Sequence, residues 1–324
     1  MIKRRFFKII IQNSVSFLLV FSFLLSSIIF KGFFLNKYNL ESIIFDNAGL
    51  ALLVLAEAIV LISGNYDLSI ESTLGISVMI GALSIVSWFS SIGYFLGIII
   101  TLAIGTIIGL IIGYMVVKQK INSLLLTLSA SIVLRGFMRY LTRGIVTVYG
   151  LPQEFCFSDF RTIFNIKFGV IVVIIIYIFF HLLMTKTRFG YEVFAIGGNK
   201  ESAFRAGISV EKNLLIVYML SGFISALAGL LMAGQMGCVP NSLGENMVFY
   251  ALAGSVIGGV SLLGGQGSII GVFGGFLFLA LVRNISMIAM FSPYALSIMQ
   301  GLLVFIAVLI NSFRGISKNF KNYL

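Results

Sequence analysis

Charged side chains are scarce in this sequence, and their scarcity excludes a soluble fold. Only 10% of the 324 residues are charged, while 59% are hydrophobic and the mean hydropathy is +1.10. Soluble domains carry about 25% charge, so lipid must solvate much of this chain. Lipid offers no hydrogen bonds to the backbone, which leaves helices or a closed barrel. The long apolar runs favour helices, which need about 20 residues to cross a bilayer, over barrel strands of about 10 residues.

Reactive side chains are also scarce, and this argues against an enzyme. His181 is the only histidine and has no second ligand four residues away, and Cys156 and Cys238 lack the spacing of a metal site. The segment 197–200 (GGNK) lacks the spacing of a phosphate-binding loop. We therefore expect no catalytic residue, metal or cofactor in this chain. We expect the two cysteines on the outer side as unpaired thiols, with a disulfide as the alternative.

Ten apolar runs predict an all-α membrane protein that forms a single transmembrane domain over residues 1–324. The first run follows a basic N-terminus and is too long and bulky for a cleaved signal peptide, so we interpret it as a retained helix. The predicted spans are 9–30, 48–64, 69–88, 92–117, 121–141, 168–184, 213–234, 247–262, 267–282 and 294–311.

The distribution of basic residues predicts the orientation. The net charge of +11 is not clustered into a stripe that would bind nucleic acid. An even number of spans places both termini on one side, and basic residues concentrate in cytosolic loops. With cytosolic termini, 14 of the 22 basic residues fall in inside loops: Lys3, Arg4, Arg5, Lys8, Lys118, Lys120, Lys186, Arg188, Lys200, Arg205, Lys212, Arg314, Lys318 and Lys321. We therefore predict a multi-pass protein of a prokaryotic plasma membrane with both termini in the cytosol.

The second and eighth predicted spans are short, and each ends in a glycine-containing break. We name residues 63–69 (SGNYDLS) the first break and residues 258–268 (GGVSLLGGQGS) the second break. Short, glycine-interrupted spans at matching places predict an internal repeat, here two five-helix halves, with a substrate path at the interface. An offset of 196 residues also aligns Ser72 with Ser268 and Gly75 with Gly271. Two ordinary tight helix hairpins are the alternative.

Several polar groups fall at membrane depth and are candidates for the translocation pathway. Asp67 precedes the third span, where a carboxylate can cap the helix, and the alternative is that the break lines the path and forms the inner gate. Glu57 lies within the second span, where an ionisable group is costly and needs a partner, and we expect Arg135 to be that partner. The candidate pathway residues are Glu57, Asn65, Asp67, Ser69, Glu71 and Arg135.

The segment 186–212 is a polar cytosolic loop that contains a predicted short helix. Asn199 is a good N-cap and Gly207 a plausible stop, which gives about two helical turns. A helix this short is marginal alone, so we expect a partner to dock on it, although an ordinary amphipathic surface helix is the alternative. The candidate docking residues are Asn199, Glu201, Ser202, Arg205 and Gly207.

The order and spacing of four motifs resemble the permeases of ribose-type ABC importers, a family that serves ribose, xylose, arabinose, galactose and autoinducer-2 import. In the first of these motifs, residues 63–72, Asn65-Tyr66 stands in place of the family's usual Gly-Ile, and Glu71 stands in place of a glycine. Glu57 stands where the family pattern generally has a small residue. The motifs lie at 63–72, 127–136 (TL…RG), 187–208, and 218–231 with 258–268.

This resemblance implies a homodimeric permease with ten helices per subunit. The short cytosolic helix would couple it to an ABC ATPase subunit, and an extracytoplasmic binding protein would deliver a monosaccharide or similar small polar solute. A permease for nucleosides or branched-chain amino acids is an alternative, although the Asp67-Leu68-Ser69 motif favours sugars. An ion-coupled secondary transporter using Glu57, Asp67 and Arg135 is an alternative from another class, as is a membrane scaffold or receptor.

Overall fold

Most of the described chain is helical. The structure, a computed structural model, describes residues 14–88, 93–162 and 165–292, together with isolated positions between 294 and 309. In chain order the elements are α2 (Ser14–Phe34), α3 (Lys37–Phe45), α4 (Ala48–Ile62), α5 (Ile70–Leu83), the π-helix η1 (Ser84–Trp88), α6 (Tyr94–Lys118), α7 (Ser123–Leu141), β1 (Thr147–Val148), the 3₁₀-helix η2 (Phe157–Asp159), α8 (Phe168–Lys186), α9 (Arg188–Gly198), α10 (Lys200–Arg205), α11 (Val210–Met236), β2 (Val239–Pro240), α12 (Met247–Ile257) and α13 (Ile269–Ile288).

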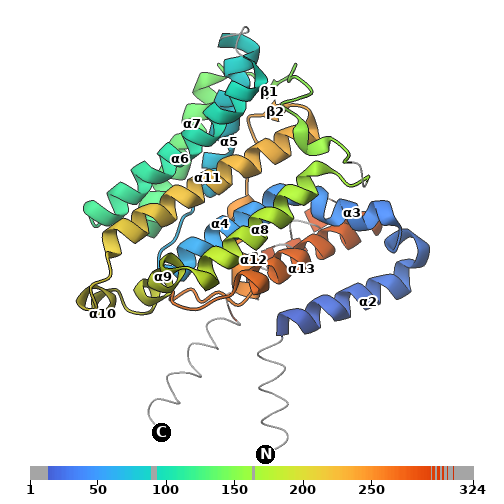
Figure 1. The fold of residues 1–324 in the computed structure, drawn as a ribbon. Coiled ribbons are helices and arrows are strands. Elements are labelled where there is room, and N and C mark those ends of the chain that lie inside the picture. Colours follow the sequence, from blue (N-terminus) through green and yellow to red (C-terminus); the bar gives the residue numbers. More distant parts are fainter. Residues whose placement is uncertain are drawn as a thin grey trace, which may run out of the picture.

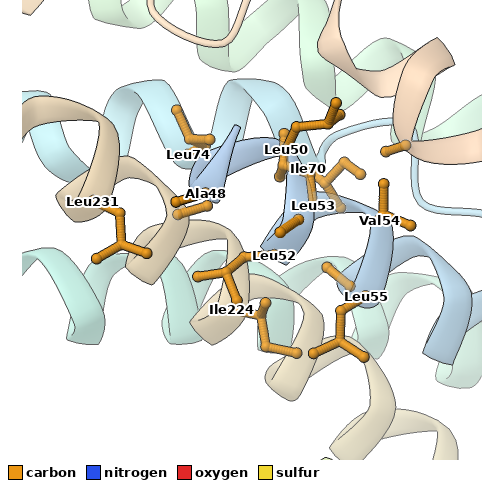
Figure 2. Packing of buried hydrophobic residues seen from close by; sticks show 14 of the residues in the cluster. Ala48, Leu50, Leu52, Leu53, Val54, Leu55, Ile70, Leu74, Ile224 and Leu231 are labelled. Atoms are coloured by element: carbon orange, nitrogen blue, oxygen red, sulfur yellow. The ribbon is translucent and has the colours of Figure 1, made fainter. Parts of the chain in front are cut away.

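Helix α4 is the centre of the packing. Each of its 15 residues is buried, and the helix is apolar all round except for Glu57, as expected for a helix with no face toward solvent or lipid. Helices α5, α8, α11, α12 and α13 surround it. Figure 2 shows its side chains packed against those of α5 and α11, among them Leu52, Leu55, Leu74, Ile224 and Leu231.

Helices α6 and α11 approach each other closely because glycines line their contact. A Cβ atom on Gly222 of α11 would lie 2.1 Å from the carbonyl oxygen of Gly105 on α6. A Cβ atom on Gly109 would lie 2.2 Å from the carbonyl oxygen of Tyr218. Small residues let helix backbones approach where lipid supplies no hydrophobic drive for association. This contact makes α11 a long, firmly held element between α6 and α4.

The two ends of α11 meet different structures, as Figure 1 shows. Helices α9 and α10 lie at its N-terminal end, and the β1–β2 pair lies near its C-terminal end. In that antiparallel pair Thr147 is opposite Pro240 and Val148 is opposite Val239. The pairing joins the long loop after α7 to the loop before α12.

The prediction of an all-α membrane protein is confirmed, and nine of the ten predicted spans coincide with described helices. The tenth, 294–311, lies mostly outside the described residues, as does the start of the first span. By length and composition six described helices can cross a membrane, and the pair α3–α4, bent by 43°, makes a seventh. Helix α12 has 11 residues and is about 16 Å long, too short to span alone. The count of ten spans stays a prediction.

The glycine contact between α6 and α11 predicts an asymmetric response to alanine. Gly222→Ala places a Cβ inside the backbone of α6, so we expect it to cost about 1–3 kcal/mol of stability. Gly136→Ala on α7 meets no atom within 4 Å and replaces a poor helix former, so it should be neutral or stabilising by up to about 1 kcal/mol. Thermal unfolding of both purified variants in detergent checks this, and equal unfolding temperatures would contradict the packing.

Candidate functional site

The first break turns the chain between α4 and α5. Gly64 adopts φ +79°, a left-handed conformation that side chains disfavour, directly after the last turn of α4. Asn65 and Tyr66 are half-buried, whereas Ser63, Asp67 and Ser69 are buried. The break therefore places a cluster of polar groups inside the helix bundle, and only Asn65 and Tyr66 among them reach partly outward.

Asp67 joins the start of α5 to the middle of α11. Its Oδ1 atom accepts hydrogen bonds from the backbone N–H of Ser69 at 3.1 Å and from the Ser69 hydroxyl at 2.5 Å. Its Oδ2 atom accepts a hydrogen bond from the Ser221 hydroxyl at 2.8 Å. Ser69 is the N-cap residue of α5, so these two bonds hold the turn that precedes the helix, and capping of α5 by Asp67 stays a prediction. The bond to Ser221 is a tertiary contact that the local sequence does not indicate.

Helices α7 and α11 provide partners for the backbone of the first break. The N–H of Tyr66 donates to Ser123 Oγ at 3.2 Å, and the N–H of Leu68 donates to Thr127 Oγ1 at 3.0 Å. The hydroxyl of Tyr218 donates to the carbonyl oxygen of Tyr66 at 3.1 Å. Sequence reasoning did not identify these three partners, because small hydroxyls and single tyrosines in apolar helices carry no distinctive pattern.

The second break bonds to the first break and to the end of α4 directly before it. The N–H of Gly265 donates to the carbonyl oxygen of Ile62, the last residue of α4, at 2.9 Å. The hydroxyl of Tyr66 donates to the carbonyl oxygen of Leu262 at 3.0 Å. The structure therefore brings together two segments about 200 residues apart in the sequence. The sequence pattern singles out these segments, and a substrate path between them stays a prediction.

Glu57 lies on α4, ahead of the first break, and is fully buried, with 0% of its surface exposed. Its carboxyl group faces the backbone N–H and the carboxylate of Asp67. Neither carboxyl oxygen makes a hydrogen bond of normal geometry within the described part of the chain. The expected pairing with Arg135 is wrong. Arg135 lies on α7, which packs mainly against α5, so its side chain does not reach Glu57.

Arg135 pairs instead with Glu71 on the first turn of α5. Arg135 Nη2 lies 3.6 Å from Glu71 Oε1, and the two side chains are only 10% and 12% exposed. Arg135 Nη1 donates to the carbonyl oxygen of Leu243 at 2.8 Å. Glu71 Oε2 accepts the N–H of Val248 at 3.0 Å, at the start of α12. Because a carboxylate stabilises a helix N-terminus, the pair joins α5 and α7 to α12.

The predicted short helix is confirmed as α10. Asn199 Oδ1 accepts the N–H of Ser202 at 2.8 Å, as an N-cap should, and Gly207 adopts φ +81° just after the helix. Glu201 and Arg205 form an ion pair at 2.5 Å with both side chains about three-quarters exposed, 74% and 76%. The exposed surface of α10 is therefore charged at positions 201 and 205.

Helix α9 precedes α10 and was not predicted. Thr187 caps α9, because its Oγ1 atom accepts a hydrogen bond from the N–H of Gly190 at 3.3 Å. Glu192 accepts hydrogen bonds from Asn213 of α11 at 2.7 Å and from Arg188 at 2.6 Å. These bonds hold the pKa of Glu192 below its usual range, so the carboxylate is ionised at neutral pH. The bond to the buried Asn213 fixes α9 to α11.

The two cysteines are free, as predicted, and both are half-buried. Cys156 lies in the loop before η2, and burial raises the pKa of its thiol. A raised pKa lowers the fraction of reactive thiolate at neutral pH.

The buried pair of Arg135 and Glu71 predicts a large cost when one partner is removed. Arg135→Ala leaves Glu71 with a buried charge, so we expect a loss of about 3–5 kcal/mol, with part of it recovered in the double variant with Glu71→Gln. Arg139→Ala is the matched control, since its pairing with Glu245 at 3.6 Å is half-exposed and should be worth at most about 1 kcal/mol. Thermal unfolding in detergent measures all three, and equal losses for Arg135→Ala and Arg139→Ala would refute the interpretation.

The chain is similar to known transport proteins over most of its length. Residues 39–308 match the family described as "Branched-chain amino acid transport system / permease component". The chain is 31% identical to the galactose/methyl galactoside import permease protein MglC of Haemophilus influenzae, over 96% of this chain and 97% of the relative. It is 29% identical to the ribose import permease protein RbsC of the same species, over 88% of each chain.

A third relative is the autoinducer 2 import system permease protein LsrC of Escherichia coli, 32% identical over 81% of this chain and 75% of the relative. No solved structure matches the chain. The family match covers most of the sequence, and the similarity to MglC extends over nearly all of it. The chain therefore belongs to the family of branched-chain amino acid transport system permease components.

Proposed function

We propose that this chain is the membrane-spanning permease subunit of an ATP-driven ABC importer, and that it translocates a monosaccharide or a similar small polar solute. The observation that carries this proposal is the similarity, over 96% of the chain, to a permease named for galactose and methyl galactoside import. The relatives named for ribose and autoinducer 2 support the same class of solute. The chain would hydrolyse no ATP itself.

We place the translocation pathway at the joined breaks. Ten spans in two halves would put the breaks at the interface between the halves. The half-buried Asn65 and Tyr66 would contact the solute, while Asp67, Ser69 and Glu57 would lie behind them. Hydrogen bonds of 2.9 Å and 3.0 Å between the breaks would be exchanged when the halves rock. Glu71 and Arg135 would hold α12 in place rather than contact solute.

We place the ATPase on α10, with α9, α10 and both termini on the cytosolic side. Helix α10 has six residues, which would not be stable alone, yet it presents an aromatic and an ion pair to the outside. Phe204 is 70% exposed, and aromatic side chains often dominate the affinity of interfaces. The complete transporter would contain two copies of this permease, an ABC ATPase subunit and an extracytoplasmic binding protein.

Two other functions are less well supported. The family description names branched-chain amino acids, but the relatives at about 30% identity are named for sugars and autoinducer 2. An ion-coupled transporter using Glu57 and Asp67 would need no partner ATPase, and its uptake would survive ATP depletion and collapse with an ionophore. Uptake that fails on ATP depletion supports the importer.

The docking proposal predicts that α10 carries the contact with the ATPase. Glu201→Ala with Arg205→Ala should abolish recovery of the ATPase subunit when the tagged permease is purified in mild detergent. An exposed pair within one helix contributes about 0.3–0.5 kcal/mol to folding, so loss of binding would not reflect unfolding. Arg139→Ala with Glu245→Ala removes a half-exposed pair elsewhere and should retain the ATPase. Equal recovery from both double variants would refute the dock.

The pathway proposal predicts that the first break reacts with aqueous reagents. In a background with Cys156→Ser and Cys238→Ser, Asn65→Cys should react with a water-soluble maleimide at least about tenfold faster than Ile59→Cys, because reaction requires an exposed thiolate. Ile59 lies within α4 and is fully buried. Saturating solute should slow the labelling of Asn65→Cys. Labelling that is equal at both positions, or unaffected by solute, would place the pathway elsewhere.

A further inference from the structure

The C-terminal end of α9 lies directly against both breaks. We name the contact, formed by Gly64, Gly197, Gly264 and Gly265, the glycine junction. A Cβ atom built on Gly264 would lie 2.6 Å from the Cα atom of Gly64 and 2.8 Å from the carbonyl oxygen of Gly197. Three segments thus meet backbone to backbone with no side chain between them.

Gly197 lies at the centre of this junction. A Cβ atom on it would lie 1.9 Å from the carbonyl oxygen of Ile62 and 2.6 Å from the backbone nitrogen of Gly265. These two atoms are the partners of the 2.9 Å hydrogen bond that joins the breaks. The end of α9 therefore covers the bond between the breaks and leaves no room for a side chain.

The glycines of the junction are required for different reasons. Gly64, Gly264 and Gly265 have φ values of +79°, +82° and +69°, so any side chain there is strained. Gly197 lies within α9 and has no positive φ, so only the close approach to the breaks excludes a side chain. The next residue, Gly198, also meets Gly265 through its backbone, but a Cβ atom on Gly198 itself would lie in open space. Alanine at either position changes α9 in the same way, but only alanine at 197 places a side chain against the breaks. Comparing the two variants therefore separates the contact with the breaks from an effect on the helix.

A second route connects the same segment to the first break. Glu192 of α9 accepts a hydrogen bond from Asn213 at the start of α11. Further along α11, Tyr218 donates a hydrogen bond to the carbonyl oxygen of Tyr66 and Ser221 donates one to Asp67. A displacement of α9 therefore reaches the first break by two routes. One is the backbone contact of the glycine junction, and the other is α11.

We propose that the glycine junction transmits movement of the α9–α10 segment to both breaks at once, and that Gly197 is the positioning residue at its centre. This inference rests on the proposed function, in which an ATPase moves α10. Direct backbone contact transmits a displacement because close-packed interiors deform little and no flexible side chain absorbs the shift. Both breaks would then change together, so the path would open to one side as it closes to the other.

The test compares Gly197→Ala with Gly198→Ala in the full transporter, reconstituted in proteoliposomes with the ATPase that copurifies and the binding protein. With radiolabelled galactose as the probe, we expect Gly197→Ala to retain the ATPase and its ATP hydrolysis but to import about tenfold fewer galactose molecules per ATP, within the usual range of coupling between sites. Gly198→Ala should keep the ratio of the unmodified protein. An unchanged ratio for Gly197→Ala would overturn the junction and leave the importer intact.

A measurement on the unmodified protein covers the case in which Gly197→Ala does not fold. Hydrogen exchange of the transporter, with and without nucleotide trapped on the ATPase, should change protection in residues 60–66 and 259–267 together with 188–207. A change confined to 199–207 would overturn the junction. If the unmodified permease recovers no ATPase at all, the proposed function itself is overturned, and the inference with it.

Discussion

In lipid, every backbone N–H and C=O group must find a partner within the protein, and this constraint organises the interior of the fold. A break in a spanning helix frees several such groups. Here the two breaks satisfy each other through the bonds from Gly265 to Ile62 and from Tyr66 to Leu262. Hydroxyls on α7 and α11 satisfy further groups of the first break. The place where the helices are interrupted is therefore also a place where distant parts of the chain are bonded to each other.

The buried charges around the breaks are unequally compensated. Glu71 and Arg135 pair with each other and are bonded further to the backbone near α12. Asp67 is held by neutral donors alone, and Glu57 makes no hydrogen bond of normal geometry among the described residues. Ionisable groups at membrane depth are costly and usually mark functional sites. The acidic groups beside the first break are therefore the reason, together with the bonded breaks, for proposing the pathway there.

Hydropathy and capping residues are sufficient to place most of the elements along the chain. Helix α4, the first break and α10 follow from local signals: an apolar run, a glycine followed by polar residues, and Asn199 before a short polar helix with Gly207 after it. These signals act over a few residues and operate in the same way in any fold. Helix α9 was missed although its buried residues Val193 and Ile196 recur at helical spacing, because its three glycines are poor helix formers.

The partners of those elements were decided only by tertiary packing. The sequence identified Arg135 and Glu57 as charges within the membrane and suggested their pairing, but α7 packs on α5, so Arg135 meets Glu71. Nor does the sequence show that Gly197 would lie against Ile62 and both breaks. The sequence by itself determined the membrane environment, the breaks and the exposed short helix, because these depend on local composition. The bonds between them depend on which helices are neighbours, which only the folded packing decides.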